Sequence, residues 1–191
     1  MNLDNFKKHI EELNKSIDTE IVNDGHTSAS KDVANEWLKN LDFKSAIELG
    51  AGLAQLLDIL ANWGKGTLAV TLGNEDVEKH NVLREDMHFT NIPDKSYDLV
   101  ISRHSLEHSY MPLILLMEMY RISKKYSLVI VPMPREEMIN WQNHYSVFDD
   151  RTWRQLFKLS HWKVIKFADK KYFGRVVDDF LEYRYLLEKE Q

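Results

Sequence analysis

Three histidines and one glutamate stand at spacings that could support proton or metal chemistry. His104, Glu107 and His108 occupy positions i, i+3 and i+4, so a helical turn would place their side chains on one face. His144 lies further along the chain. Imidazoles accept protons near neutral pH, which makes His104 and His144 candidate catalytic residues. Imidazole and carboxylate groups also bind divalent metals, so all four residues are candidate metal ligands.

A glycine-rich turn is the second feature with a chemical use. Gly50-Ala51-Gly52 follows a short apolar segment, 45–49, and precedes an apolar stretch typical of a helix, 53–60. Glycine allows the backbone to bend sharply and to approach a ligand without a Cβ in the way. At the carboxyl end of a strand in an open α/β sheet, such a turn faces the crevice where ligands bind.

The turn does not fit a nicotinamide dinucleotide site. The dinucleotide fingerprint requires a third glycine at the position that Gln55 occupies in this chain. It also requires an acidic residue at the end of the second strand, where Thr71 and Leu72 stand. We therefore expect the turn to serve a different ligand.

Apolar segments that alternate with helical patterns predict the elements that position these residues. The predicted strands are 45–49, 67–72, 82–85, 97–102, 126–131, 162–167 and 181–187. The predicted helices are 53–60, 112–122 and 151–159. The segment 181–187 also fits a helix, and the alternation of its aromatic residues favours a strand. Buried strands alternating with helices indicate βαβ units and a parallel sheet, with the glycine turn and His144 at its carboxyl edge.

The N-terminal segment, residues 1–42, predicts two helices ahead of this core. The first carries a stripe of apolar residues three or four positions apart: Leu3, Phe6, Ile10, Leu13 and Ile17. A second apolar stripe, over 33–41, follows the N-cap candidates of 27–30. These helices either pack on the core of 43–191 or form a lid over its site, where His26 would reach the ligand. In both cases residues 1–191 form a single domain.

Composition excludes several classes of function. The chain has 191 residues and no cysteine, so it has no disulfide, thiol nucleophile or thiolate metal site. Its 25 Lys and Arg against 30 Asp and Glu give a net charge of −5, which disfavours non-specific nucleic-acid binding and leaves a local basic patch open. The longest apolar stretch, Met111–Met117, is too short to span a membrane. We expect a cytoplasmic protein without a signal peptide.

Five short segments follow one another in a characteristic order. Ile47–Gly52 joins an acidic residue to the glycine turn, and Asp86-Met87 follows the third predicted strand. Ile92-Pro93 leads into the fourth strand, after which Ser102–His108 ends in Leu-Glu-His. Glu118–Ile122 carries Glu and Arg three positions apart. Over most of the chain this series resembles the class I S-adenosylmethionine-dependent methyltransferases, in particular small members with the Leu-Glu-His motif.

The resemblance implies a fold and a set of cofactor-binding residues. The fold is a Rossmann-like three-layer α/β sandwich with a seven-stranded, mostly parallel sheet in the order 3-2-1-4-5-7-6. Glu48 would orient the turn and the methionine end of S-adenosylmethionine, and Asp86 would accept from the adenine amino group. The complete set of implied cofactor residues is Glu48, Gly50, Ala51, Gly52, Thr71, Leu72, Asp86, Met87, Ser102 and Arg103.

Three departures from the family pattern stand out. Ala54 replaces the third glycine of the first motif, and Ser123–Tyr126 replaces a Pro-Gly-Gly turn. Thr71 replaces the acidic residue that usually holds the ribose, as in the cyclopropane fatty acid synthases, which this Thr-Leu pair resembles. These departures support one alternative hypothesis, a non-catalytic protein that keeps the fold for binding.

The favoured function is methyl transfer from S-adenosylmethionine to a small-molecule hydroxyl. The histidine cluster supports an alternative, because it resembles the Glu-x-x-Glu-His and distant His of metal-dependent small-RNA 3′-terminal 2′-O-methyltransferases, with His104 in place of the first Glu. That alternative predicts a divalent metal and a sugar or RNA-terminal ribose as acceptor. Leu-Glu-His also occurs in metal-free methyltransferases, which leaves Glu107 and His108 a structural role. Trp141, Tyr145 and Phe148 either line a substrate pocket or belong to the core, and the oligomeric state stays open.

Overall fold

One mixed sheet organises the molecule. The computed structural model describes residues 30–72, 81–172 and 180–190, together with residues 4, 5, 7–9 and 12. The strands are β1 (Ser45–Leu49), β2 (Gly66–Val70), β3 (Val82–Leu83), β4 (Tyr97–Arg103), β5 (Ser123–Pro132), β6 (Trp162–Tyr172) and β7 (Phe180–Lys189). They form a seven-stranded sheet in the order β3-β2-β1-β4-β5-β7-β6, which confirms the predicted fold class and strand order.

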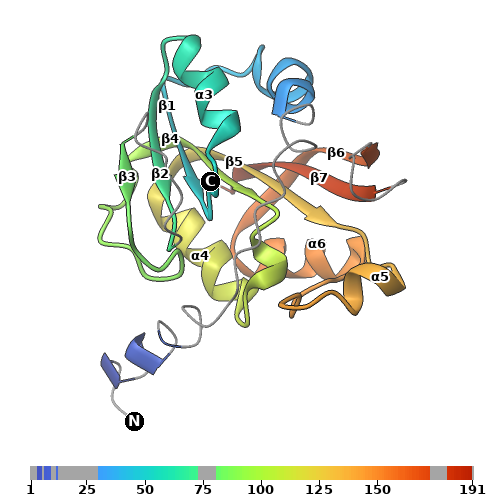
Figure 1. The fold of residues 1–191 in the computed structure, drawn as a ribbon. Helices are drawn as coiled ribbons and strands as arrows, with labels where there is room; N and C mark the ends of the chain where they lie inside the picture. The colour runs from blue at the N-terminus through green and yellow to red at the C-terminus, as the bar shows by residue number, and fades with distance from the viewer. Residues whose placement is uncertain are drawn as a thin grey trace.

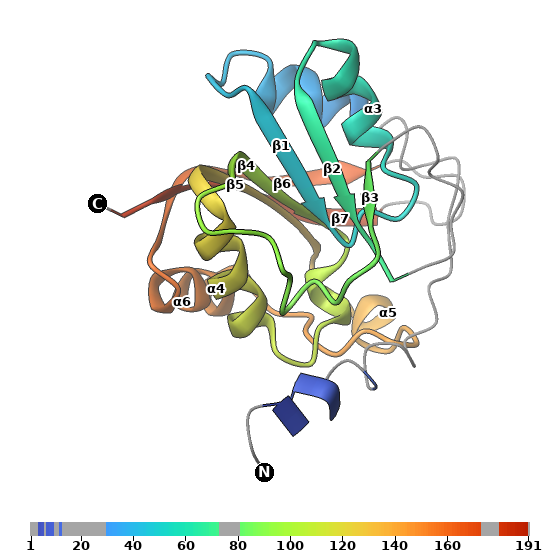
Figure 2. The same cartoon turned by 90° about the vertical axis from the view of Figure 1, so that its left-hand side faces the viewer.

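The direction of the strands puts most of their carboxyl ends at one edge. The pairs formed among β1 to β5 are parallel, and β7 runs antiparallel to both β5 and β6. In Figure 2 the arrowheads of β1 and β2 point to the same side of the molecule. The segment 181–187, which also fitted a helix, is a strand, since it lies within β7.

Helices cover both faces of the sheet and complete the three layers. They are η1 (Ala34–Leu38), α3 (Gln55–Asn62), η2 (Leu106–His108), α4 (Pro112–Ile122), α5 (Glu136–Ile139) and α6 (Asp150–Leu159). Figure 1 shows η1 and α3 on one face of the sheet, and α4 and α6 on the other. No helix formed by the described residues has the length and apolar character that a membrane crossing requires.

The central strands contain continuous apolar runs because both of their faces are covered. Alternate residues of a strand point to opposite faces. Leu99 and Ile101 of β4 therefore pack in the cluster under η1 and α3, whereas Val100 packs in the cluster under α4 and α6. All three side chains are fully buried. This double burial explains why the sequence shows continuous apolar runs instead of alternation.

The observed bounds differ from the predicted ones where the chain turns. The helix after the glycine turn starts at Gln55, two residues later than expected, because Ala54 adopts a left-handed conformation with φ of 53°. The short helix α5 was not expected. The N-terminal stripe at 3–17, His26, Gly73 and His80 lie outside the described residues.

Candidate functional site

The turn between β1 and α3 is built from left-handed residues. Gly50, Gly52 and Ala54 have φ values of 73°, 49° and 53°. The amides of Gly50 and Ala51 donate to the carbonyl of Val70, at 2.9 and 3.0 Å, and fasten the turn to the end of β2. Left-handed conformations are accessible to glycine at little cost, so the two glycines follow from the shape of the turn.

The two glycines of the turn face different surroundings. A Cβ on Gly50 would lie 2.3 Å from Oγ of Ser105, whose hydroxyl donates to the Gly50 carbonyl at 2.9 Å. A Cβ on Gly52 would meet no atom of the described residues within 4 Å. Gly50 is thus required by packing, whereas the described residues leave space in front of Gly52 from which a ligand can approach the backbone.

A buried charged pair lies beside this turn. Glu48 is 1% exposed, and its Oε1 lies 3.4 Å from Nε of Arg103. The guanidinium of Arg103 also donates to Oγ of Ser30, at the start of the helical segment that includes η1. Burial raises the pKa of Glu48, and the Arg103 charge opposes that shift. Oε2 of Glu48 and Oγ of Ser102 are buried without a hydrogen-bond partner among the described residues. Such atoms are rare in native proteins unless a ligand or water meets them.

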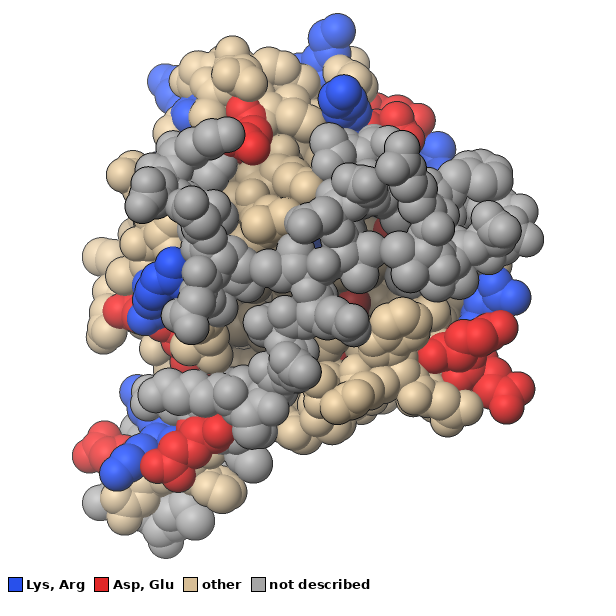
Figure 3. All heavy atoms as spheres, viewed as in Figure 1, with Lys and Arg blue, Asp and Glu red and all other residues tan. Residues whose placement is uncertain are grey.

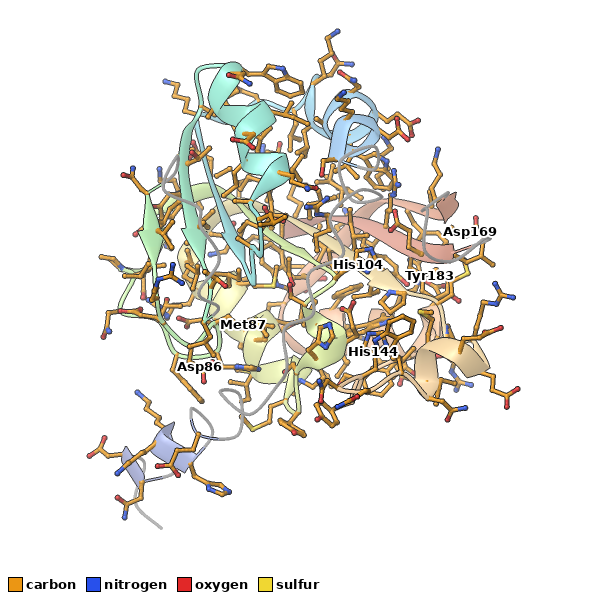
Figure 4. The ribbon with its side chains drawn as sticks, viewed as in Figure 1. Asp86, Met87, His104, His144, Asp169 and Tyr183 are labelled. Atoms are coloured by element: carbon orange, nitrogen blue, oxygen red, sulfur yellow. The ribbon has the colours of Figure 1, made fainter. Side chains whose placement is uncertain are left out.

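The remaining predicted cofactor residues lie at the same edge. Thr71 is buried directly after β2, and its amide donates to the Leu83 carbonyl at 3.2 Å. Asp86 is buried, and its Oδ1 accepts from the backbone amide of His88 at 2.8 Å and lies 2.7 Å from Nδ1 of the same residue. Leu72 follows Thr71 and is half-buried, as is Met87, whose sulfur lies 3.4 Å from the position of a Cβ on Gly50. Figure 4 shows Asp86 and Met87 on one side of the site and His104 and His144 on the other.

His104 is held between two carboxylates. Its Nδ1 lies 3.3 Å from Oε1 of Glu107, and its Nε2 lies 2.8 Å from Oε2 of Glu182. Burial alone would lower the pKa of His104, but the hydrogen bonds to the two carboxylates outweigh burial and raise it to about 9. Both ring nitrogens are thus engaged, which favours a structural role for His104. That it is a proton acceptor or a metal ligand stays a prediction from the sequence.

Glu107, His108 and His144 do come together. Their potential ligand atoms all lie within 4.8 Å of one another. Nδ1 of His108 lies 2.9 Å from the Asn143 carbonyl, and Nδ1 of His144 lies 2.8 Å from the Met138 carbonyl. Because a carbonyl only accepts, both Nδ1 atoms carry the proton, and each Nε2 is left for another contact. Burial lowers the pKa of His144, so its ring is neutral at pH 7.

Glu107 ties the loop after β4 to the loop after β5. Its backbone carbonyl accepts from the amides of Tyr145 and Ser146, at 2.7 and 2.9 Å. Burial raises the pKa of its carboxyl, but the hydrogen bond and charge of His104 outweigh burial and keep the pKa below its usual value. Oε2 of Glu107 is buried without a hydrogen-bond partner in the described part of the chain. The site therefore presents one carboxylate oxygen near the rings of His108 and His144.

The aromatic residues proposed for a pocket divide into two groups. Phe148 packs on the fully buried Trp153, with ring centroids 5.3 Å apart, and belongs to the core. Trp141 and Tyr145 are 37% and 43% exposed. Trp141 stacks on His144 at 6.2 Å, so one exposed aromatic ring directly adjoins the histidine pair.

Two residues of the site were not found by sequence reasoning, Glu182 and Arg184. They lie on β7 opposite the aromatic face of Tyr183 and Tyr185, and they are 1% and 3% exposed. The only signal in the sequence is the period-two alternation, which does not distinguish a buried polar face from a solvated one.

Comparison with known families supports a methyltransferase. Residues 47–131 match the family model described as a methyltransferase domain. This segment, somewhat under half of the chain, runs from β1 to β5 and contains the glycine turn, Asp86 and Glu107. The match agrees with the prediction of a methyltransferase domain in this part of the chain. None of the curated proteins matches the sequence.

Solved structures share the fold. A methyltransferase of Archaeoglobus fulgidus is 15% identical, with 85% of this chain and 94% of that chain covered and a TM-score of 0.70. The 1,6-didemethyltoxoflavin-N1-methyltransferase of Burkholderia thailandensis is 12% identical, with 98% and 87% covered and a TM-score of 0.72. The magnesium protoporphyrin IX methyltransferase of Synechocystis is 10% identical, with 99% and 96% covered and a TM-score of 0.71. At these identities the likeness is one of fold.

The two glycines of the turn should differ in their tolerance of alanine. Both substitutions force a left-handed alanine, at a cost of about 1–2 kcal/mol. Gly50→Ala also drives a Cβ against Ser105, which should add about 1–3 kcal/mol. Urea unfolding should therefore show a larger loss of stability for Gly50→Ala than for the matched control Gly52→Ala. Equal losses would contradict the packing role of Gly50.

The charge of His104 should make stability depend on pH. Its pKa rises from 6.5 to about 9 on folding, so its contribution is fully present below pH 6.5 and is lost as pH rises through about 9. The free energy of unfolding should fall across this window, and the fall should be smaller in His104→Gln. An identical slope in both proteins would show that the imidazole is not charged in the folded state.

Proposed function

We propose that this protein transfers the methyl group of S-adenosylmethionine to a hydroxyl group of a small molecule. The observation that carries the proposal is the position of the left-handed glycine turn and of the Glu107–His108–His144 group at the same edge of the sheet. A methyl donor at the turn and a proton acceptor beside it are the two parts that such a reaction needs.

The residues around the turn fit the donor. The open space in front of Gly52 allows backbone contact, and the unpartnered buried oxygens of Glu48 and Ser102 can meet its polar methionine end. Thr71 and Leu72 would adjoin the ribose. Asp86, held by His88, would accept from the adenine amino group, next to Met87.

The chemistry of the chain itself is binding, alignment and proton transfer. S-adenosylmethionine would supply an electrophilic methyl carbon. The acceptor oxygen would form a bond to this carbon while the carbon–sulfur bond breaks, with S-adenosylhomocysteine as the leaving group. His144 would accept the hydroxyl proton on Nε2 as the carbon–oxygen bond forms, because its Nδ1 proton is committed to the Met138 carbonyl. Glu107 would stabilise the resulting imidazolium through its negative charge.

A small acceptor fits the surface better than a nucleic acid. Among the described residues on the face drawn in Figure 3, Lys and Arg side chains lie apart from one another instead of forming one basic stripe. Two of the proteins with this fold are named as methyltransferases of small molecules, 1,6-didemethyltoxoflavin and magnesium protoporphyrin IX. The exposed ring of Trp141 beside His144 offers a surface for such an acceptor.

Titration with S-adenosylhomocysteine, the demethylated cofactor, tests the donor site. The purified protein should give saturable heat, and Asp86→Asn should weaken binding by about 1–3 kcal/mol because one oxygen facing the adenine becomes an amide. Asp42→Asn, an exposed substitution, is the matched control and should bind as the wild type does. The absence of measurable binding heat at millimolar S-adenosylhomocysteine would contradict the proposal and favour a non-catalytic role.

The Glu107–His108–His144 group supports a second candidate, a metal-assisted methyltransferase acting on a sugar or ribose diol. Two imidazoles and one carboxylate match the protein ligands of catalytic zinc sites. Both Nδ1 atoms donate to carbonyls, which is the usual second contact of a metal-binding histidine. The ligand atoms, which lie within 4.8 Å of one another, would have to approach to about 3.4 Å around a tetrahedral ion.

Calorimetric titration of chelator-treated protein with Zn²⁺ tests this second candidate. His108→Ala should weaken binding by more than the roughly 10- to 100-fold typical of losing an outer-shell partner. His9→Ala removes an exposed histidine and serves as the control. Equal zinc affinity in both variants would remove the metal from the mechanism and leave His144 as the proton acceptor.

A further inference from the structure

A series of buried charged side chains connects β7 to the site. Nε of Arg184 lies 2.5 Å from Oε1 of Glu182, and Oε2 of Glu182 lies 2.8 Å from Nε2 of His104. Nδ1 of His104 then lies 3.3 Å from Oε1 of Glu107. We infer that His104, Glu182 and Arg184 are positioning residues, which hold the Glu107 carboxylate in the orientation that the proposed reaction uses. The inference rests on the proposed function, since it assigns Glu107 to that site.

Stability alone does not explain these contacts. Each of the four charges has lost most of its hydration. The exposed fraction of the side chain is 12% for His104, 1% for Glu107, 1% for Glu182 and 3% for Arg184. Taking charges out of water is so costly that a buried ion pair is often no more stabilising than apolar residues of the same volume. The cations His104 and Arg184 alternate with the anions Glu107 and Glu182, so the net charge of the four groups is zero. Such a network, with every charge paired, is better suited to fixing geometry.

The backbone of His104 gives a second, independent indication. His104 has φ of 50°, in the left-handed region that residues with a side chain rarely adopt. Its amide donates to the carbonyl of Ile130 on β5 at 2.9 Å, which anchors the strained residue. This conformation turns the ring to a place where it touches both carboxylates. Strain of this kind persists where the surroundings over-determine it, commonly at functional sites.

His104 and Glu182, which we call the clamp, leave one oxygen of Glu107 for other contacts. Oε1 of Glu107 contacts His104, and Oε2 has no hydrogen-bond partner in the described residues. The ligand atoms of His108 and His144 lie within 4.8 Å of this carboxylate. His104 and Glu182 are 78 positions apart in sequence, so this contact ties the His104 ring to a strand of the sheet. A contact within a local turn would not fix the ring to the sheet in this way.

Crystal structures of the intact wild type and of Glu182→Ala test the positioning role. In the wild type, Nδ1 of His104 should contact Oε1 of Glu107, and Nε2 of His104 should contact Glu182. Glu182→Ala removes the group that holds the second nitrogen of His104, so the His104 ring and the Glu107 carboxylate should change orientation while the backbone of the sheet stays in place.

The matched control is Glu188→Ala, which removes a half-exposed carboxylate of the same strand that pairs only with Lys125 among the described cations. It should leave the orientation of the Glu107 carboxylate unchanged. The same Glu107 orientation in Glu182→Ala as in the wild type would overturn the inference. A wild-type crystal structure in which His104 contacts neither carboxylate would overturn it without any variant. Neither measurement needs S-adenosylmethionine or an acceptor, so failure here is distinct from failure of cofactor binding.

Discussion

The burial of charge at the carboxyl edge of the sheet is the constraint on which the site depends. A parallel sheet covered on both faces leaves little water near the strand ends, so every charge placed there needs a partner. The chain meets this need with three groups of contacts, which are Glu48 with Arg103, Asp86 with His88, and Glu107 with His104, Glu182 and Arg184. The polar atoms that remain unpartnered mark where a ligand can bind.

These pairings also connect parts of the fold that the backbone does not hold together. Arg103 joins β4 to the helical segment at Ser30, and His88 joins the loop after β3 to Ser109, through Nε2 and Oγ 2.6 Å apart. The clamp at His104 joins β4 to β7. Each contact spans two elements, so a substrate that meets this edge finds side chains already oriented. Preorganisation of this kind is what alignment of a methyl donor and its acceptor requires.

The sequence predicted the strands of the sheet, but it did not predict how the buried charged side chains pair. Double burial makes the strands at 97–102 and 126–131 visible as apolar runs, and both lie within β4 and β5. The contacts of His104 were not foreseen because the i, i+3, i+4 spacing assumes a continuous helix, whereas this residue is left-handed and precedes the short turn η2. Glu182 and Arg184 were missed because a strand with one aromatic face suggests a solvated opposite face. Only the packing of β7 against β5 reveals their burial.

The central claim is that the cofactor and the proton acceptor meet at one edge of the sheet. A crystal structure of the protein with S-adenosylhomocysteine tests it most directly. The account predicts that the amino-acid end of the ligand contacts the Gly50–Gly52 turn and that its sulfur faces the side of His144. Ligand bound elsewhere, or bound at the turn with its sulfur directed away from His144, would contradict the account.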